Sequence, residues 1–194
     1  MKSITVFCGA NSGVDEIYEK QANLLGQVLA KKGIRLVYGG AKVGLMGAIA
    51  DGALSAGGEV VGVLPKFLQE KELAHEKLTE LVVVNSMHER KLKMNDLCDG
   101  VIALPGAFGT LEELFEMFTW AQLGLHEKPV AILNINGFYD SLNVLTKNMV
   151  DNGFLKKENR DMLIVSDNIE ELLQKMATYK APEVGKWITK EKLT

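Results

Sequence analysis

Short apolar runs alternate with longer amphipathic runs along nearly the whole chain, and this alternation limits the possible folds more than any other feature. The apolar runs predict strands at residues 4–8, 34–38, 59–64, 81–85, 101–104, 130–135 and 162–165. The amphipathic runs predict helices at residues 15–32, 45–56, 86–97, 110–125, 139–152 and 168–179. Residues 66–79 fit neither pattern, and we expect a short, partly helical excursion there.

Strands that alternate with helices predict right-handed crossover connections and a parallel sheet. The strand runs are apolar throughout rather than alternately apolar and polar, which is typical of a sheet covered by helices on both faces. A length of 194 residues favours one domain with a large core. We therefore expect a doubly wound α/β fold of about seven mostly parallel strands over residues 1–180. A polar tail follows at residues 181–194, in which only Trp187 is expected to pack.

Composition and charge narrow the classes of function. Apolar residues make up 47% of the chain, which argues against a disordered or fibrous protein. A net charge of -3 without a Lys/Arg block argues against a nucleic-acid partner. No apolar run reaches the length of a membrane span and the N-terminus has no signal-peptide pattern, so we expect no membrane association. Cys8 and Cys98 lack metal spacing and fit a reducing, cytoplasmic location.

Three glycine-rich loops follow predicted strands, at residues 9–13, 39–47 and 105–109. The carboxyl ends of parallel strands meet at one edge of the sheet, and ligands of such folds bind there, where the strand order reverses. The sequence contains neither the Gly-x-Gly-x-x-Gly fingerprint after a strand nor a Walker lysine motif. The candidate nucleotide or phosphate contacts in the first two loops are Gly9, Ser12, Gly39, Gly40, Gly44 and Met46.

The third loop leads from a strand directly into a helix at residues 104–113. Pro105 and two glycines allow a tight turn whose backbone comes close to a ligand. The first N–H groups of the helix point at this turn without an intrahelical partner, which makes an anion site. We expect Glu112 and Glu113 in the first helical turn, so the pattern favours a phosphorylated substrate and acid–base or electrostatic chemistry.

The helix at residues 86–97 carries two cations on its apolar face. It begins with a capping box, Ser86-x-x-Glu89. Arg90 and Lys91 share the face of the buried methionines and lie near the helix N-terminus, where the dipole disfavours cations. In the functional interpretation they meet a phosphate or a carboxylate, which we favour for Arg90 because a buried cation needs a partner. In the alternative, their stems follow apolar surface and their heads reach water.

Glu112 and Glu113 also have a simple structural interpretation, since acidic residues in a first turn complement the helix dipole. Glu113 shares a side of the helix with Thr110 and Met117, away from the main apolar stripe. Glu112 lies beside Glu116 at the i+4 position, which is typical of a solvated or interface edge. Glu113 is therefore the better candidate for an enclosed carboxylate.

Other chemistries lack the residues that they require. His75, His88 and His126 have no second ligand at metal-ligand spacing, so we expect no metal site. We expect His88 to lie at the surface or to cap a helix. No Gly-x-Ser-x-Gly elbow occurs and neither cysteine has a matching histidine, so nucleophilic acyl chemistry has no support.

Three motifs resemble those of a known family. Residues 105–113, Pro-Gly-Ala-Phe-Gly-Thr-Leu-Glu-Glu, resemble the Pro-Gly-Gly-x-Gly-Thr-x-x-Glu signature of the "lonely guy" (LOG) cytokinin-activating proteins, which were long misnamed lysine decarboxylases. Residues 87–91, Met-His-Glu-Arg-Lys, are similar to the family's second signature, and residues 39–47 to its first glycine-rich loop. Residues 119–124 and 137–140 also match, and the resemblance spans about residues 4–180.

The resemblance implies a Rossmann-like homodimer whose single domain binds a nucleotide and hydrolyses its N-glycosidic bond. The family's substrates are N6-substituted adenosine 5′-monophosphates, often with AMP itself, and the products are the free base and ribose 5-phosphate. It implies no metal or redox cofactor. Arg90 and Glu113 match the family's catalytic positions. The residues that match its substrate-binding positions are Glu72, Arg90, Lys91, Gly106, Ala107, Phe108, Gly109, Thr110, Leu111, Glu112 and Thr119.

One residue departs from the family signature, because Ala107 replaces its second glycine. If that position needs a positive φ, alanine costs about 1 kcal/mol. If the glycine serves only close approach, the methyl group trims the pocket. Cleavage of an N-glycosidic bond passes through an oxocarbenium-like state, so by analogy with O-glycosidases we assign Glu113 to the sugar and the attacking water. Arg90 would hold Glu113 or the substrate in place.

Two other functions stay open. A non-catalytic nucleotide-binding module could use the same glycine loops, but it would not require both Arg90 and Glu113. A decarboxylase would need a lysine bound to pyridoxal phosphate, and only Lys42 and Lys91 lie near glycine loops. The helix at residues 110–125 is apolar nearly all round, so we also expect a two-fold dimer through it and the helix at residues 86–97.

Overall fold

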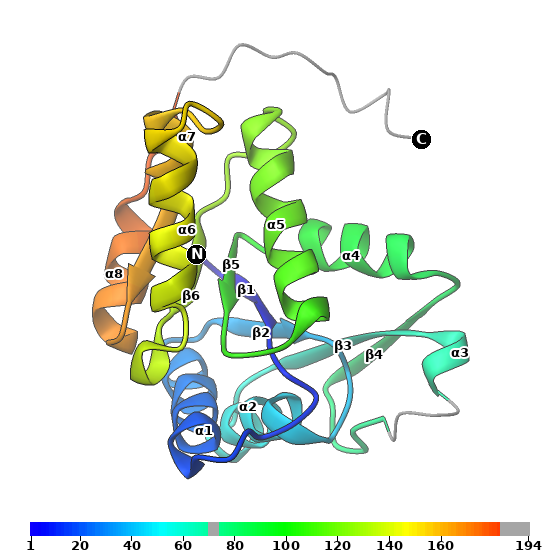
Figure 1. Ribbon diagram of the computed structural model, residues 1–194. Coiled ribbons are helices and arrows are strands. Elements are labelled where there is room, and N and C mark those ends of the chain that lie inside the picture. Colours follow the sequence, from blue (N-terminus) through cyan, green and yellow to red (C-terminus); the bar gives the residue numbers. More distant parts are fainter. Residues whose placement is uncertain (70–73, 183–194) are drawn as a thin grey trace.

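The computed structural model describes residues 1–69 and 74–182, which form one α/β fold around a central sheet (Figure 1). The sheet has seven strands. The strands are β1 (Ser3–Phe7), β2 (Arg35–Tyr38), β3 (Val60–Pro65), β4 (Glu80–Val84), β5 (Gly100–Ala103), β6 (Val130–Leu133) and β7 (Leu163–Ser166). Their order is β4-β3-β2-β1-β5-β6-β7, and each neighbouring pair is parallel. The predicted doubly wound α/β class with about seven strands is confirmed.

Helices cover both faces of this sheet. One face carries α1 (Glu16–Lys31), α2 (Gly44–Ser55) and α8 (Ile169–Thr178), and the other carries α4 (Met87–Asp96), α5 (Phe108–Gln122) and α6 (Asp140–Asp151) (Figure 1). Alternate residues of each strand supply the two cores: Ile4 and Val6 of β1 pack with α1 and α2, whereas Phe7 packs with α4 and α5. Both cores are apolar because β1, β3, β5 and β6 are buried throughout, as the continuous apolar runs predict, whereas the edge strand β4 is partly exposed.

Local sequence explains where the helices begin and end. The Asp15 carboxylate accepts the N–H of Ile17 at 3.0 Å and caps α1, and Gly33 at a φ of +66° ends it. Ser86 accepts the N–H of Glu89 at 3.1 Å at the start of α4, so the predicted cap is confirmed.

The start of α5 differs from the prediction. The helix begins at Phe108 rather than at residue 110, because Ala107 has the extended conformation of an N-cap and Phe108 already belongs to the helix. Glu112 and Glu113 therefore do not lie in the first turn, and the expectation that they do was wrong. An acidic residue complements the helix dipole only in the first turn, so the dipole does not explain why a glutamate occupies position 113.

Three short elements lie in connections. They are α3 (Lys66–Gln69), α7 (Lys157–Arg160) and a single 3₁₀ turn, η1 (Ile135–Gly137). In the predicted excursion, α3 is followed by a bridge between Ala41 and Ala74, and residues 70–73 between them lie outside the described chain. Glu72 falls there, and Trp187 of the tail likewise lies outside the described residues.

The strand order reverses between β1 and β5, which lie side by side at the centre of the sheet. From β1 the chain continues toward β4, and from β5 it continues toward β7, so the loops after these two strands part at this point. The Gly9 N–H donates to the Pro105 carbonyl at 3.0 Å, and the Leu45 N–H donates to the Gly9 carbonyl at 3.1 Å. Backbone hydrogen bonds thus hold the three glycine-rich loops together. Within the described chain, each helix is too short or too polar to cross a bilayer.

Candidate active site

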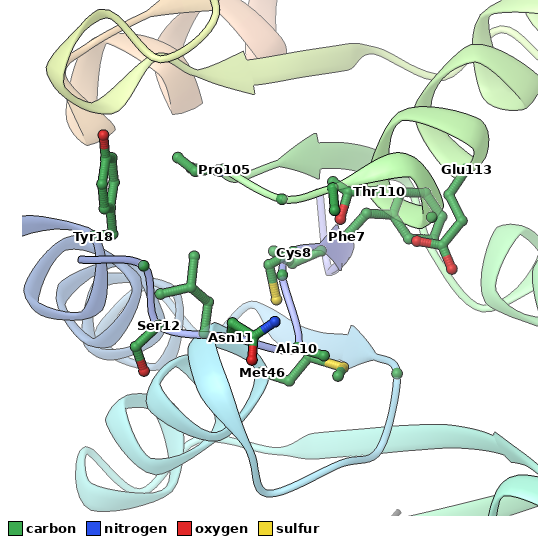
Figure 2. A pocket seen from close by; sticks show the side chains of 18 of the residues that line it. Phe7, Cys8, Ala10, Asn11, Ser12, Tyr18, Met46, Pro105, Thr110 and Glu113 are labelled. Atoms are coloured by element: carbon green, nitrogen blue, oxygen red, sulfur yellow. The ribbon is translucent and has the colours of Figure 1, made fainter. Parts of the chain in front are cut away.

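A cavity of about 450 Å³ opens where these loops meet. Figure 2 shows Glu113 and Thr110 at one end of it, Tyr18 at the other, and the loop after β1 along its floor. The other residues of its wall are Val6, Phe7, Cys8, Gly9, Ala10, Asn11, Ser12, Gly13, Gly39, Leu45, Met46, Met87, Arg90, Met94, Pro105, Gly106, Ala107, Gly109 and Phe138. The cavity therefore lies at the carboxyl edge of the sheet, as the glycine loops predict.

The N-terminus of α5 forms one wall of the cavity without a side-chain cap. Its first N–H groups have no intrahelical acceptor, so they can bind an anion. A Cβ atom on Gly106 would lie 2.1 Å from the Thr110 hydroxyl oxygen, so packing against Thr110 requires this glycine. A Cβ atom on Gly109 would meet no described atom within 4 Å, so packing does not require that glycine. Its bare backbone leaves the turn accessible to a ligand.

Ala107 occupies its signature position without strain. Its φ of -96° and ψ of -154° lie in the extended region that any residue adopts. Ala107 therefore does not need a positive φ, and its methyl group causes no backbone strain. Of the two explanations for the family's glycine at this position, close approach to the ligand is the one that applies to this chain. Ala107 lies on the cavity wall, where its methyl group slightly reduces the space.

Arg90 extends from α4 to the backbone of β3 and of the loop that follows β2. Its Nε donates to the Val63 carbonyl at 3.0 Å, and its Nη2 donates to the Gly39 carbonyl at 3.2 Å. A Cβ atom on Gly39 would lie 2.3 Å from Nη2, so this glycine makes room for the guanidinium. The side chain is only 9% exposed, which excludes the alternative in which its head reaches water.

Glu113 faces Arg90 from α5. Its Oε1 lies 3.9 Å from Nη1 of Arg90, at the limit of an ion pair, and its side chain is 11% exposed. Burial raises the pKa of this carboxyl to about 7; the Arg90 charge opposes the rise, and the nearby Glu112 adds to it. Burial and the Glu113 charge also raise the pKa of the Cys8 thiol, so this wall residue stays protonated and is a poor nucleophile.

Lys91, the next residue of α4, points elsewhere. Its ammonium lies 2.5 Å from the Glu112 carboxylate and 3.0 Å from the Glu116 carboxylate, and its side chain is 6% exposed. Lys91 and both of these glutamates are absent from the described residues that line the cavity. The head of Lys91 does not reach water, and two carboxylates of α5 bind it instead.

The structure thus divides the predicted site residues into three groups. The cavity brings together Arg90, Gly106, Ala107, Gly109, Thr110, Glu113, Gly9, Ser12, Gly39 and Met46. Among the described residues, those that do not line it are Lys91, Phe108, Leu111, Glu112, Thr119, Gly40 and Gly44. Phe108 is almost fully exposed, and the Thr119 hydroxyl donates to the Phe115 carbonyl at 2.8 Å on the far side of α5. Glu72 lies outside the described residues, and its role stays a prediction.

Several other residues of the wall were not named as site candidates from sequence, among them Cys8, Asn11, Tyr18, Met87 and Phe138. The ring centroids of Tyr18 and Phe138 lie 6.1 Å apart in an edge-to-face arrangement, and this pair closes one end of the cavity. Phe138 follows β6 and lies within residues 137–140, which match a family motif, so both its place after a strand and that motif were available signals. Tyr18 lies in a helix and gave no comparable signal.

Metal ligands do not gather in this part of the protein. Within residues 1–69 and 74–182, no three His, Cys, Asp or Glu side chains come close enough to hold an ion. Nε2 of His75 lies 3.0 Å from the Asp51 carboxylate, and Nε2 of His126 lies 3.0 Å from the Met117 carbonyl. His88 is exposed, as predicted.

Comparison with known proteins identifies relatives over most of the chain. The family model described as "Possible lysine decarboxylase" matches residues 46–176. The cytokinin riboside 5′-monophosphate phosphoribohydrolase of Rhodococcoides fascians is 49% identical over 170 residues, which cover 87% of this chain and 86% of that protein. The Arabidopsis thaliana enzyme of the same name, LOG5, is 44% identical over 184 residues, which cover 95% of this chain and 81% of that protein.

Solved structures agree on the fold. The structural-genomics target TM1055 superposes with a TM-score of 0.70 and 25% identity, covering 92% of this chain and 100% of its own. The molybdenum cofactor binding protein of Rippkaea orientalis gives a TM-score of 0.67 at 24% identity, covering 92% of this chain and 99% of its own, and indicates the fold alone. Because the family model matches more than half of the chain and relatives exceed 40% identity over nearly all of it, this protein belongs to the LOG family of phosphoribohydrolases.

Proposed function

We propose that this protein hydrolyses the N-glycosidic bond of adenosine 5′-monophosphates, including N6-substituted ones, and releases the free base and ribose 5-phosphate. The names of the relatives from R. fascians and A. thaliana support this substrate class. One observation carries the proposal: the buried Glu113 carboxylate faces Arg90 in a cavity that also contains the uncapped start of α5. A site that only binds phosphate has no need of this buried carboxylate.

The arrangement fits the two ends of a ribose 5-phosphate group. The 5′-phosphate would bind the N–H groups at the start of α5, near Gly106 and Gly109. Glu113 lies on the same helix about one turn beyond Thr110, and both residues line the cavity. A ribose bound by its phosphate at this turn would therefore bring its C1′ atom toward the Glu113 carboxylate.

In the reaction, a water oxygen forms a bond to C1′ while the C1′–N bond breaks and its electron pair leaves with the base. The carboxylate of Glu113 stabilises the positive charge that develops on the sugar and accepts the proton of the attacking water. The departing base takes up a proton from solvent. Arg90, fixed by the Val63 and Gly39 carbonyls, keeps its positive charge beside Glu113 and favours the ionised form of the carboxyl.

Pyridoxal chemistry has less support. A decarboxylase would need a free lysine in the cavity to form the Schiff base. Lys91 binds two carboxylates, and the Lys42 ammonium lies 3.5 Å from the Glu76 carboxylate. Neither lysine lines the cavity in the part of the chain that the structure describes. We therefore propose that the reaction needs no metal and no organic cofactor, and an absorbance scan of the purified protein should contain no aldimine band.

We also propose a cytoplasmic homodimer. Phe108 and Phe115 of α5 are exposed large apolar side chains, and a second copy of the chain could cover them across a two-fold axis. Cys8 and Cys98 are free and buried, which fits a reducing compartment. Light scattering at micromolar concentration should give twice the mass of the chain, and a monomer would contradict the dimer.

The proposed activity can be tested directly. The protein should be incubated without metal with AMP, N6-isopentenyl-AMP and the monophosphates of guanosine, cytidine and uridine, and the free bases separated by chromatography. We expect base release from the adenosine monophosphates, and none with Glu113→Gln. A folded protein that binds AMP in calorimetry but releases no base from any of these substrates would instead be a nucleotide-binding module.

A further inference from the structure

Two adjacent cations of α4 are directed to opposite sides of the helix junction. Arg90 reaches into the cavity, where the Glu113 carboxylate lies 3.9 Å away. Lys91 reaches behind α5, where its ammonium lies 2.5 Å from Glu112 and 3.0 Å from Glu116. The same stretch of sequence therefore supplies one cation to the cavity and one to the packing of two helices.

The Lys91 ammonium is charged and enclosed. Burial alone lowers its pKa, but the hydrogen bonds and charges of Glu112 and Glu116 outweigh burial and raise it above the usual value. The Lys91 side chain is 6% exposed, and that of Glu116 is 23% exposed. A charged group removed from water in this way depends on its partners, so these contacts hold α4 and α5 in one relative position.

We propose that Lys91 is a positioning residue: by binding Glu112 and Glu116 it fixes the rotation of α5 about its axis, and this rotation aims Glu113 into the cavity opposite Arg90. This role rests on the proposed hydrolase function, because the aim of Glu113 matters only if it acts on the sugar. It differs from the substrate contact that the family resemblance implies for Lys91.

The geometry around Glu113 explains why such a device is needed. The contact of Glu113 with Arg90 is long, at 3.9 Å, so this contact cannot fix its orientation. Glu112 precedes Glu113 directly and Glu116 lies about one turn beyond it, so Lys91 binds α5 on both sides of the catalytic position. A rotation of the helix would move the carboxylate away from its position opposite the sugar. Small misplacements of a reacting group strongly reduce the reaction rate.

Lys91 should also affect the ionisation of Glu113. Among the described residues, the charged groups that act on Glu113 are Arg90 and Lys91 from α4 and Glu112 and Glu116 from its own helix, and the Cys8 thiol just after β1 is affected by the Glu113 charge in turn. The two flanking glutamates raise the pKa of Glu113, and Lys91 lowers it. Without Lys91 the pKa of Glu113 should therefore rise further, and less of it would be ionised at neutral pH.

The test compares Lys91→Met, Lys91→Arg and a control, Lys157→Met, which removes an exposed lysine that pairs with Asp161 four residues away. The first readouts are kcat for AMP and the calorimetric Kd of ribose 5-phosphate. The third is the titration of the Glu113 carboxyl, followed by carbon NMR in the protein without ligand. This third readout needs no turnover, so it tests the role of Lys91 even if the proposed activity is absent.

We expect Lys91→Met to lower kcat by about tenfold or more, since a displaced reacting group is costly. The Kd of ribose 5-phosphate should change little, and the Glu113 titration should move to higher pH. Lys91→Arg keeps a cation between the two carboxylates and should restore most of kcat and the titration. If Lys91→Met does not fold, Lys91→Arg and the double variant Glu112→Gln with Glu116→Gln take its place. The double variant should lower kcat without weakening binding.

Two results would overturn the role. A tenfold weaker Kd with unchanged kcat would make Lys91 a substrate contact. An unchanged kcat together with an unchanged Glu113 titration, in a folded Lys91→Met protein, would make the ion pairs irrelevant to the site. A missing activity in the wild-type protein, with the expected titration shift intact, would instead contradict the proposed function and leave the electrostatic part of the role in place.

Discussion

The inner and outer sides of the α4–α5 junction are built from the same kinds of side chain in opposite ways. On the inner side, Arg90 and Glu113 face each other across 3.9 Å. On the outer side, Lys91 holds Glu112 and Glu116 at 2.5 and 3.0 Å. Close pairing keeps charges fixed, whereas loose pairing in a buried place leaves the pKa of Glu113 near 7. The difference separates the groups that hold the helices from the group that can change its charge.

Removal of the inner carboxylate should have the largest effect. Glu113→Gln keeps the shape of the side chain but removes the charge that, in the proposed mechanism, stabilises the sugar cation and accepts the proton of water. We expect kcat to fall by about a thousandfold, because the substitution removes both general-base and electrostatic catalysis. The Kd of AMP should stay within about threefold of the wild-type value, because the phosphate still meets the backbone at the start of α5.

Steady-state turnover of AMP and calorimetry of the same protein preparation would check this. A variant that loses AMP binding as strongly as turnover would make Glu113 a binding residue. The inner side of the junction would then bind substrate without a catalytic carboxylate, and the proposed difference in role between the two sides would be wrong.

The inner carboxylate should also leave a signature in stability. Its pKa is about 7 in the folded protein and 4.5 in the unfolded chain, so the folded state binds the proton more tightly. The resulting stabilisation is complete below pH 4.5 and is lost as the pH rises from 4.5 to 7. Relative to Glu113→Gln, the wild-type protein should lose about 3 kcal/mol of unfolding free energy between pH 4 and pH 8.

Urea denaturation of the two proteins at pH 4, 6 and 8 measures this difference, and the subtraction removes the contribution of the other carboxyls. A difference that does not depend on pH would mean that Glu113 titrates normally, as a solvent-exposed carboxylate does. The outer glutamates offer the comparison: Glu112→Gln should not reproduce the trend, because Glu112 is half-exposed and paired with Lys91.

Much of this arrangement could be predicted from the sequence. The alternation of apolar and amphipathic runs predicted all seven strands, and the positions of the glycine loops predicted the edge at which the cavity opens. The helical face of Glu113 was also predicted, since about 100° per residue separates it from Glu112 whatever residue begins the helix. Patterns that depend only on local spacing survive an error in the helix boundary.

The partners of the charged residues could not be predicted in the same way. Arg90 and Lys91 have the same pattern environment, yet one donates to the carbonyls of Val63 and Gly39 and the other binds two glutamates. These contacts join residues that are far apart in the chain, and their choice depends on how α4 lies over the sheet. The contact between Phe138 and Tyr18 at the end of the cavity could not be predicted either, because it depends on how the loop after β6 packs against α1.

Displacing Arg90 without changing its charge would sharpen the comparison. A methyl group in Gly39→Ala would lie 2.3 Å from Nη2 of Arg90 and 2.8 Å from the Met46 sulfur, so the guanidinium must move. We expect kcat to fall by about tenfold, because the displaced guanidinium no longer favours the ionised form of the Glu113 carboxyl, and the melting temperature to fall as well, because the buried guanidinium loses its hydrogen bonds. Turnover and thermal denaturation of the variant provide the measurement.

Gly109→Ala is the matched substitution, because its methyl group would meet no described atom within 4 Å. It should leave the melting temperature unchanged and weaken AMP binding, since the added group lies where the phosphate would approach the backbone. Equal loss of kcat and equal Kd in the two variants would show that the two glycines do not have separate roles.

The smallest effect is expected on the outer side, for Glu112→Gln. The carboxylate is 54% exposed, and Lys91 keeps its ion pair with the less exposed Glu116 when Glu112 is neutralised. An exposed member of an ion pair contributes about 1 kcal/mol or less, so kcat and Kd should change by less than about fivefold. Turnover and calorimetry should be measured for this variant, for Glu116→Gln and for the double variant. The double variant should lose more than the two single losses combined, because only then is the Lys91 cation buried without a partner. If Glu112→Gln proves as damaging as Glu113→Gln, the assignment of the catalytic carboxylate to the inner face of α5 is wrong.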